Sequence, residues 1–217
     1  MTRSTVPAAA LTAAALILLT ACGGGGGDKS SDKITSTQSA ATTTTSASPS
    51  ASATAGVQRP VITFPPDAKN VFEDQHTGDP KKDAVLADNE QMVDSIYSAI
   101  IQGNAHTSAM AFYSKGLALG SAATFVQGWV DGAATWTGTI RWFDRKVTLR
   151  NDGSAAVLYC SDESKAYPKS RKTNKIDRSP SNTASYVLYN TTLEKSPDGV
   201  WQTVNLVSQR GAKACKP

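Results

Sequence analysis

The 217-residue chain carries 22 Lys and Arg against 18 Asp and Glu, a formal net charge of +4 at neutral pH. A surplus this small lacks the electrostatic footprint of a nucleic-acid-binding protein, so we expect no nucleic-acid partner. Hydrophobic residues make up 40% of the chain, but their uneven distribution divides it into three segments of different composition.

The first segment, residues 1–21, has the order of a bacterial signal peptide. Arg3 supplies positive charge near the N-terminus, and residues 8–19 form an uncharged apolar run. This run is shorter than the about 20 residues that cross the hydrocarbon core of a bilayer. We therefore interpret residues 1–21 as an export signal that is removed from the mature chain.

The residues around the first cysteine, Leu19-Thr20-Ala21-Cys22, resemble the lipobox of bacterial lipoproteins. In that family a transferase attaches diacylglycerol to the cysteine sulfur, and a peptidase then cuts before it. The resemblance implies that Cys22 begins the mature chain and anchors it to the outer face of the cell membrane. One acyl chain holds a protein only marginally, so two or three are needed for a stable anchor. The alternative is an ordinary cysteine after an ordinary secretory signal.

The second segment, residues 22–58, follows Cys22 with five glycines and continues mostly with Ser, Thr and Ala. Such a composition buries too little apolar surface to offset the entropy of ordering, which predicts a disordered tether. As a flexible chain of about 36 residues it has a root-mean-square reach of about 30–36 Å. Its Ser- and Thr-rich part carries O-linked sugar or stays bare, and a bare tether is the simpler interpretation.

The third segment, residues 59–217, has a globular composition and the length of a single domain. Export to an oxidising compartment favours a disulfide between Cys160 and Cys215, which would close a loop of about 56 residues. No His or further Cys stands at metal-ligand spacing, so we expect no metal and no other cofactor.

The expected helices come first in this domain. Asp79-Pro80 is typical of an N-cap and first helical position, and apolar residues then recur with helical period over residues 81–102 until Gly103. Shorter helices are predicted over residues 105–114 and 121–131, separated by Gly116, Gly120 and Gly132.

Strands are expected after residue 135. The predicted strands cover residues 137–150, 155–161, 183–195 and 200–210, with turns at Asn151-Asp152-Gly153 and Ser196-Pro197-Asp198-Gly199. The alternation of apolar and polar residues along the first predicted strand changes phase between Trp142 and Phe143, which predicts a β-bulge. Helices followed by a run of strands indicate an α+β domain, with the helices packed on a curved antiparallel sheet.

A basic cluster lies between the second and third predicted strands. It consists of Lys165, Lys169, Arg171, Lys172, Lys175 and Arg178. A solvated loop is the simpler interpretation, and contact with anionic lipid or an anionic envelope polymer is the alternative.

This order of elements resembles the nuclear-transport-factor-2-like fold, a cone of helices in a curved sheet, and more specifically a group of actinobacterial lipoproteins. The resemblance covers about residues 67–215. It rests on the long helix, on Cys160-Ser161-Asp162-Glu163-Ser164-Lys165, on Asp198-Gly199-Val200-Trp201 and on Cys215. Most members of that group have no assigned activity, whereas other branches of the fold are ketosteroid isomerases and polyketide cyclases with a Tyr, Asp or His inside the cone.

The candidate catalytic residues are few. Asp144, at the predicted bulge, is a weak candidate for a general base if it points into an apolar pocket; the alternative is an ion pair with Arg141 or Arg145. His76 and His106 fall outside the strands, so surface roles are expected for both. Asp162 and Glu163 are interpreted as a structural turn with a helical N-cap, and acid–base work by the pair of carboxylates is the alternative.

A ligand pocket is expected where the helices give way to the sheet. Its predicted lining is Trp129, Trp136, Trp142, Phe143, Tyr159 and Tyr186, with Phe125 and Tyr189 nearby. Core packing explains these aromatic residues equally well.

The sequence thus favours a membrane-anchored, extracytoplasmic module that binds an envelope protein or a small apolar ligand without catalysis. The alternative is a small isomerase, dehydratase or cyclase that acts on an apolar substrate.

Overall fold

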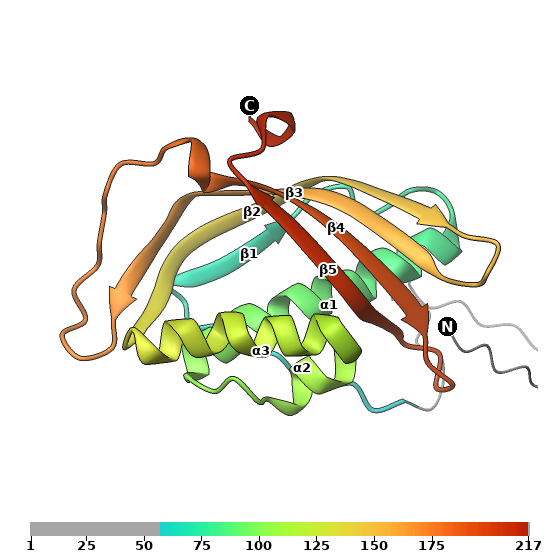
Figure 1. Cartoon of the computed structure of the whole chain (residues 1–217), viewed down its shortest axis with the longest axis horizontal. Helices are drawn as coiled ribbons and strands as arrows, with labels where there is room; N and C mark the ends of the chain where they lie inside the picture. The colour runs from blue at the N-terminus through green and yellow to red at the C-terminus, as the bar shows by residue number, and fades with distance from the viewer. Residues whose placement is uncertain (1–56, 217) are drawn as a thin grey trace, which may run out of the picture. The chain divides into compact units, whose positions relative to one another are not determined.

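A computed structural model describes residues 57–216 (Figure 1). The signal peptide, Cys22 and the tether up to residue 56 lie outside the described residues. The elements in chain order are β1 (Ala68–Phe72), α1 (Pro80–Gln102), α2 (Ser108–Tyr113), α3 (Gly116–Asp131), β2 (Ala134–Leu149), β3 (Ala155–Ser170), the 3-10 turn η1 (Thr183–Ser185), β4 (Tyr186–Lys195), β5 (Trp201–Arg210) and the 3-10 turn η2 (Lys213–Cys215).

One curved sheet of five strands, in the order β1-β2-β3-β4-β5, faces the three helices (Figure 1). The pairs from β2 to β5 are antiparallel, as the sequence predicted, and the α+β class is confirmed. The arrangement is the one that the resemblance to nuclear-transport-factor-2-like proteins implies. β1 was not expected: it adds to the edge beside β2 in parallel, which makes the sheet mixed.

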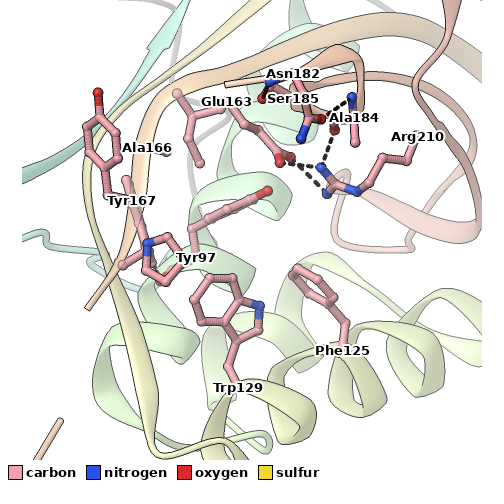
Figure 2. A pocket seen from close by; sticks show the side chains of 13 residues that line it. Tyr97, Phe125, Trp129, Glu163, Ala166, Tyr167, Asn182, Ala184, Ser185 and Arg210 are labelled. Atoms are coloured by element: carbon pink, nitrogen blue, oxygen red, sulfur yellow. Dashed lines mark hydrogen bonds and ion pairs between the residues drawn. The ribbon is translucent and has the colours of Figure 1, made fainter. Parts of the chain in front are cut away.

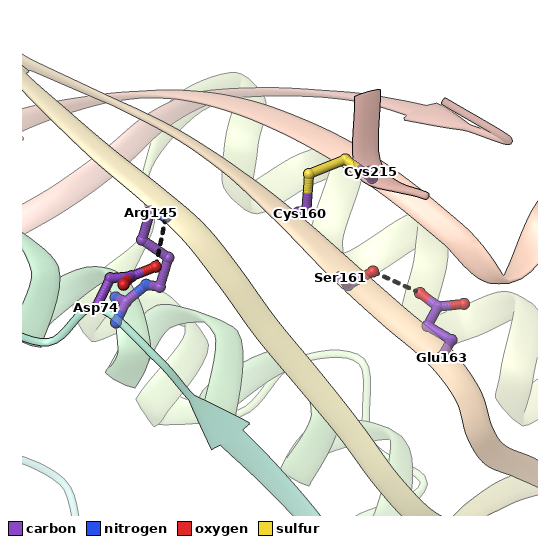
Figure 3. Close-up of a disulfide and its surroundings, with 6 residues drawn as sticks. All are labelled: Asp74, Arg145, Cys160, Ser161, Glu163 and Cys215. Atoms are coloured by element: carbon purple, nitrogen blue, oxygen red, sulfur yellow. Dashed lines mark hydrogen bonds between the residues drawn. A yellow bond between two sulfur atoms is a disulfide. The ribbon is translucent and has the colours of Figure 1, made fainter. Parts of the chain in front are cut away.

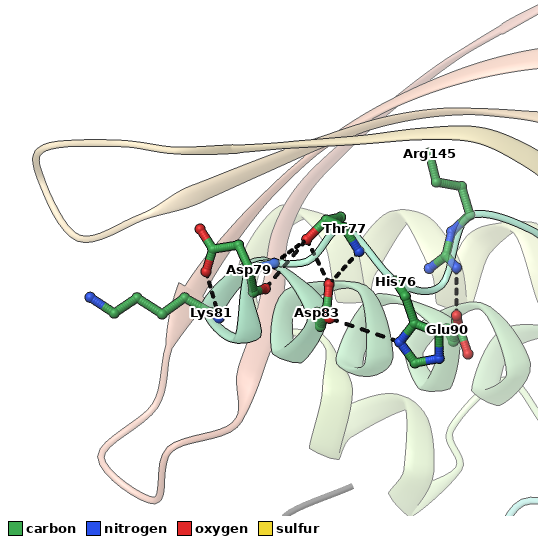
Figure 4. A network of polar contacts seen from close by, with 7 residues as sticks. All are labelled: His76, Thr77, Asp79, Lys81, Asp83, Glu90 and Arg145. Atoms are coloured by element: carbon green, nitrogen blue, oxygen red, sulfur yellow. Dashed lines mark hydrogen bonds and ion pairs between the residues drawn. The ribbon is translucent and has the colours of Figure 1, made fainter. Parts of the chain in front are cut away.

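Local capping explains why α1 begins and ends where the sequence indicated. The Asp79 side chain accepts a hydrogen bond from the backbone N of Lys81 at 2.9 Å, Pro80 occupies the first turn, and Gly103 adopts φ 69°. A left-handed residue of this kind is a common helix stop, and glycine adopts it without strain. Upstream, Thr77 donates to Asp83 from both its backbone N (2.7 Å) and its hydroxyl (2.6 Å), which fastens the entry to the helix (Figure 4).

α3 is longer than predicted, because it continues through Gly120 from Gly116. A glycine inside a helix costs about 1 kcal/mol relative to alanine. Burial of Ala122 and Val126 in the core offsets that cost. The break expected at Gly120 was therefore wrong.

β3 is also longer than predicted, ending at Ser170 and not at residue 161. The sequence of its second half has little strand character, but the equally long β2 pairs with it from Ala134↔Ser170 onward. Gly138 makes this close pairing feasible: at φ 100°, a Cβ added there would lie 2.1 Å from the carbonyl oxygen of Lys165. The pairing partner, more than local propensity, sets the length of β3.

The predicted irregularity in β2 is present. Register shifts fall between Thr139 and Arg141 and between Phe143 and Lys146, and Asp144 within the second shift has φ 53°. A bulge of this kind increases local twist, which contributes to the curvature of the sheet.

The core lies between α1 and the concave face of the sheet. Trp142 is at its centre, with Tyr97 and Tyr159 against its ring at centroid distances of 5.6 and 5.9 Å. Its indole Nε1 donates to Asn70 on β1 at 3.0 Å, and the indole of Trp136 donates to the carbonyl of Tyr97 at 3.1 Å. These two bonds satisfy buried indole groups and fix β2 relative to β1 and α1.

On the convex face, Cys160 of β3 and Cys215 of η2 form a disulfide with Cα atoms 5.5 Å apart (Figure 3). Phe143, Tyr186 and Leu188 pack against it. The bond fastens the C-terminal turn to the middle of the sheet, on the side away from the helices.

Within residues 57–216, the structure contains no helix with both the length and the apolar character required to cross a membrane.

Candidate functional site

A cavity of about 360 Å³ opens between the helices and the concave face of the sheet (Figure 2). Its apolar wall is aromatic: Tyr97 comes from α1, Phe125 and Trp129 come from α3, and Trp136 comes from β2. Ile140, Ala166 and Pro168 complete this wall. Cavities of a few hundred Å³ with mostly apolar walls are typical of small-molecule sites.

Helical spacing places two of these rings together. Phe125 and Trp129 are four residues apart on α3, so both point from the same face of the helix, with ring centroids 6.4 Å apart. Tyr97 meets Phe125 at 6.5 Å and Trp136 at 5.5 Å, each in an edge-to-face arrangement. Phe125 is 42% exposed, an unusual fraction for a large apolar ring and one that marks the mouth of the pocket.

An ion pair forms the polar wall. Nη1 of Arg210 on β5 donates to Oε2 of Glu163 on β3 at 2.7 Å, and the same nitrogen donates to the carbonyl of Ala184 at 2.7 Å (Figure 2). The other carboxylate oxygen, Oε1, accepts longer bonds of 3.4 Å from Nη2 of Arg210 (Figure 2) and from the hydroxyl of Ser161 (Figure 3). Glu163 is more buried than its partner, with side-chain exposures of 17% and 51%.

Tyr97 supplies a neutral polar group between the two walls. Its burial, with the neighbouring Tyr189 and Glu163 adding to the effect, raises the pKa of the Tyr97 hydroxyl well above its ordinary value. The hydroxyl thus stays protonated across the physiological range and can donate a hydrogen bond to a ligand. Figure 2 shows it pointing toward the Glu163 side of the pocket.

The structure divides the six predicted pocket residues among three places. Trp129 and Trp136 line the cavity. Trp142 and Tyr159 are each only 1% exposed and belong to the sealed core. Phe143 and Tyr186 pack against the disulfide on the convex face. Successive strand residues point to opposite faces, and the predicted cluster mixed residues from both faces.

Asp144 does not point into an apolar pocket, as a general base at this position would have to. Its side chain is exposed at the bulge and outside the cavity. The alternative ion pairs are not formed either, because Arg141 pairs with Glu73 at 3.1 Å and Arg145 turns inward. The Arg145 side chain is fully buried and donates to Glu90 on α1 (Figure 4) and to the carbonyl of Leu86 at 2.9 Å.

Of the other titratable candidates, Glu163 lines the cavity, whereas His76, His106 and Asp162 lie outside it. His76 is exposed, with its Nδ1 3.8 Å from Asp83 (Figure 4), and His106 is an exposed residue before α2. Asp162 accepts a bond from the backbone N of Ser164 at 2.9 Å. It does so within β3, so the interpretation of Asp162 and Glu163 as a turn was wrong.

Sequence reasoning did not place Tyr97, Glu163 or Arg210 in the pocket, although Glu163 was considered beside Asp162 as one of a pair of carboxylates. Tyr97 falls on the apolar face of α1, so in the sequence it cannot be told from an ordinary core residue. Glu163 and Arg210 are 47 residues apart and meet because β3 and β5 both flank β4. The available signal was opposite charge on two predicted strands, with an acidic residue just after one and a basic residue at the end of the other.

No group of three metal-ligating side chains occurs within the described part of the chain.

Together these features define an α+β domain with a small aromatic pocket beside an ion pair. No family model matches the sequence, and no curated protein matches it. Among solved structures it is similar to Aln2 from a Streptomyces species, with 12% identity and a TM-score of 0.41 over 58% of this chain and 90% of that one.

Two further solved structures show weaker similarity. The intermembrane space region of the chloroplast protein ARC6 has 10% identity and a TM-score of 0.32, over 60% of this chain and 95% of that one. A candidate ketosteroid isomerase from Shewanella frigidimarina has 13% identity and a TM-score of 0.30, over 64% and 100%. At these values the comparisons assign neither a family nor an activity to this chain.

Proposed function

We propose that this protein is a lipid-anchored, extracytoplasmic module that binds a small, largely apolar molecule in its aromatic pocket. The observation that carries the proposal is the cavity of about 360 Å³ with Tyr97, Phe125, Trp129 and Trp136 in its walls. The lipobox-like sequence at Cys22 supports the anchor and the extracytoplasmic location.

Binding accounts for the pocket better than catalysis does. Both oxygens of Glu163 accept hydrogen bonds within the protein, and the pocket lining contains no histidine. The Tyr97 hydroxyl and the ion pair offer polar contacts to one end of a ligand, while the aromatic rings cover its apolar body.

A titration with 1-naphthol, a neutral aromatic probe that fits such a cavity, tests this proposal. Phe125→Ala should weaken binding about tenfold, because a lost aromatic contact costs about 0.5–1.5 kcal/mol beyond the area it buries. The matched control is Leu117→Ala on the same helix, whose side chain is 76% exposed and outside the pocket. Equal affinities for the two variants, or no saturable binding to the wild type, would refute the pocket as a ligand site.

The alternative function is that of a small isomerase, dehydratase or cyclase with an apolar substrate. One observation favours it: a carboxylate, Glu163, and a protonated hydroxyl, Tyr97, both line the pocket. A positioned base and a hydrogen-bond donor are the two groups that proton abstraction beside a carbonyl requires.

Deuterium exchange into 2-tetralone, an enolisable aromatic ketone, distinguishes the two functions. An enzyme of this type should accelerate exchange about 10²–10⁴-fold over buffer and lose the acceleration in Glu163→Gln. A binding module should bind the ketone and leave its exchange rate at the buffer value.

A further inference from the structure

A second, larger hollow of about 860 Å³ adjoins the aromatic pocket. It lies between the start of β2 and the loop of residues 171–182, which joins β3 to η1 (Figure 1). Lys169, Lys172, Lys175 and Arg178 line it together with one acidic residue, Asp177, which gives the lining a formal charge of +3. We call this hollow the basic groove.

Backbone hydrogen bonds hold the groove loop in a defined shape. The backbone N of Ser170 donates to the carbonyl of Lys175 at 2.9 Å, and that of Asp177 donates to the carbonyl of Pro168 at 2.9 Å. Arg171 fastens the loop to the body of the domain, donating from Nη1 to the carbonyl of Ile101 and from Nε to that of Ala134, both at 3.0 Å. The basic side chains are thus presented from an ordered segment.

Three of the four basic residues are available to a ligand. Lys169 is engaged with Asp67 at 3.1 Å. Lys172, Lys175 and Arg178 are exposed, and none forms an ion pair among residues 57–216. Asp177 accepts bonds from the hydroxyl and backbone N of Ser179, at 2.7 and 3.0 Å, and so is satisfied within its own loop.

The linings of the two cavities meet at one residue. Pro168 lines both of them. Tyr167 lines the aromatic pocket, and the guanidinium of Arg178, from the groove, lies 5.0 Å from the centre of its ring. The basic groove and the aromatic pocket thus meet at Pro168 and at the contact between Arg178 and Tyr167.

We propose that the ligand is an anionic amphiphile, with an apolar body in the aromatic pocket and a phosphate-type head group in the basic groove. This inference rests on the proposed binding function and names the class of molecule that the site takes. Lys and Arg are the side chains that pair with phosphate oxygens, and several together provide selectivity for an anionic end over a neutral one.

Three probes that share one tail test the inference by calorimetric titration of the intact mature protein: octyl phosphate, octanol and octyltrimethylammonium. Octyl phosphate should bind about tenfold more tightly than octanol at low ionic strength, since three partly exposed ion pairs each add a modest amount. The difference should shrink as salt screens the charges, and the cationic probe should bind most weakly.

A triple variant, Lys172→Gln, Lys175→Gln and Arg178→Gln, should remove the preference for octyl phosphate and leave the affinity for octanol unchanged. Its charge-matched control is Lys81→Gln, Lys146→Gln and Lys213→Gln, three exposed residues outside both cavities, which should retain the preference.

The outcomes distinguish a failure of the anionic head group from a failure of the apolar pocket. Equal binding of octyl phosphate and octanol would overturn the anionic head group and leave the apolar pocket standing. Tightest binding of octyltrimethylammonium would also overturn it, and would indicate a cation held by the aromatic rings and Glu163. Absence of binding by all three probes would refute the proposed function itself.

Discussion

The carboxylate of Glu163 on β3 and the guanidinium of Arg210 on the edge strand β5 meet at 2.7 Å, and the guanidinium also holds the carbonyl of Ala184 at 2.7 Å. One side chain thus joins two strands that are not neighbours and fixes η1 beside the pocket. Ala184 and Ser185 of η1 are part of the pocket lining, so Arg210 controls the position of this wall.

Arg210→Ala should release η1 while changing global stability by less than about 1 kcal/mol, because Arg210 is half exposed and such pairs are weak. Amide hydrogen exchange should become faster over residues 182–186 and stay unchanged in α1. The control is Arg150→Ala, at an exposed residue directly after β2. Unchanged exchange in Arg210→Ala would contradict a role for Arg210 in holding this wall.

Asp94 on α1 should make the domain less stable at neutral pH than at mildly acidic pH. Burial, opposed by a hydrogen bond from Asn70 and reinforced by Glu90, raises the pKa of the Asp94 carboxyl to about 6. A carboxyl with a raised pKa in the folded state binds its proton more tightly than in the unfolded chain. Its contribution to stability is complete below about pH 4 and is lost as the pH rises through about 6.

Urea unfolding at pH 5 and pH 7.5 measures this effect. Asp94→Asn, which keeps an oxygen acceptor for Asn70, should be more stable than the wild type at pH 7.5 by on the order of 2 kcal/mol. The two proteins should converge at acidic pH. Asp198→Asn, in an exposed turn, should follow the wild type at both values. A wild-type stability that is equal at both pH values would count against the raised pKa.

The disulfide between Cys160 and Cys215 should contribute about 4 kcal/mol to the free energy of unfolding, from the loop entropy of a cross-link that spans 55 residues. Cys215→Ser should lower the urea midpoint accordingly, and reduction of the wild type should have the same effect. Thiol labelling of the oxidised, denatured protein should leave both cysteines unmodified. Labelling of either one would contradict the bond.

Lipidation should depend on Cys22, which lies outside the described residues. Cells that express the Cys22→Ser variant should not incorporate a labelled fatty acid into the protein, because the thioether to diacylglycerol requires the sulfur. Cys160 and Cys215 serve as internal controls, since their replacement should leave labelling intact. Continued labelling of Cys22→Ser would refute the assignment of the anchor.

The sequence predicted the elements whose ends are set by capping residues and turns close by in the chain. Asp79, Pro80 and Gly103 mark α1 to within one residue. β1 has only five residues, and its hydrogen-bond partner β2 follows it much later in the chain. The residues around β1 therefore do not by themselves predict a strand. The second half of β3 forms because β2 offers a partner along its whole length.

The site was partly predictable for the same reason. Trp129 and Trp136 flank the helix-to-sheet transition and were placed in the pocket from the sequence. Glu163 and Arg210 required knowledge of which strands flank β4, and the inward turn of Arg145 required the position of Glu90. Each of these relationships depends on tertiary packing, which neither spacing nor composition reveals.

Fluorine NMR of protein labelled with 5-fluorotryptophan tests the pocket most directly, because the four tryptophans divide between the site and the rest of the domain. Trp129 and Trp136 line the pocket, whereas Trp142 is sealed in the core and Trp201 lies on β5 away from the lining. On titration with 1-naphthol, the resonances of Trp129 and Trp136 should shift saturably while that of Trp201 stays in place. Saturable shifts at Trp201 alone, or at none of the four, would contradict a ligand site in this pocket.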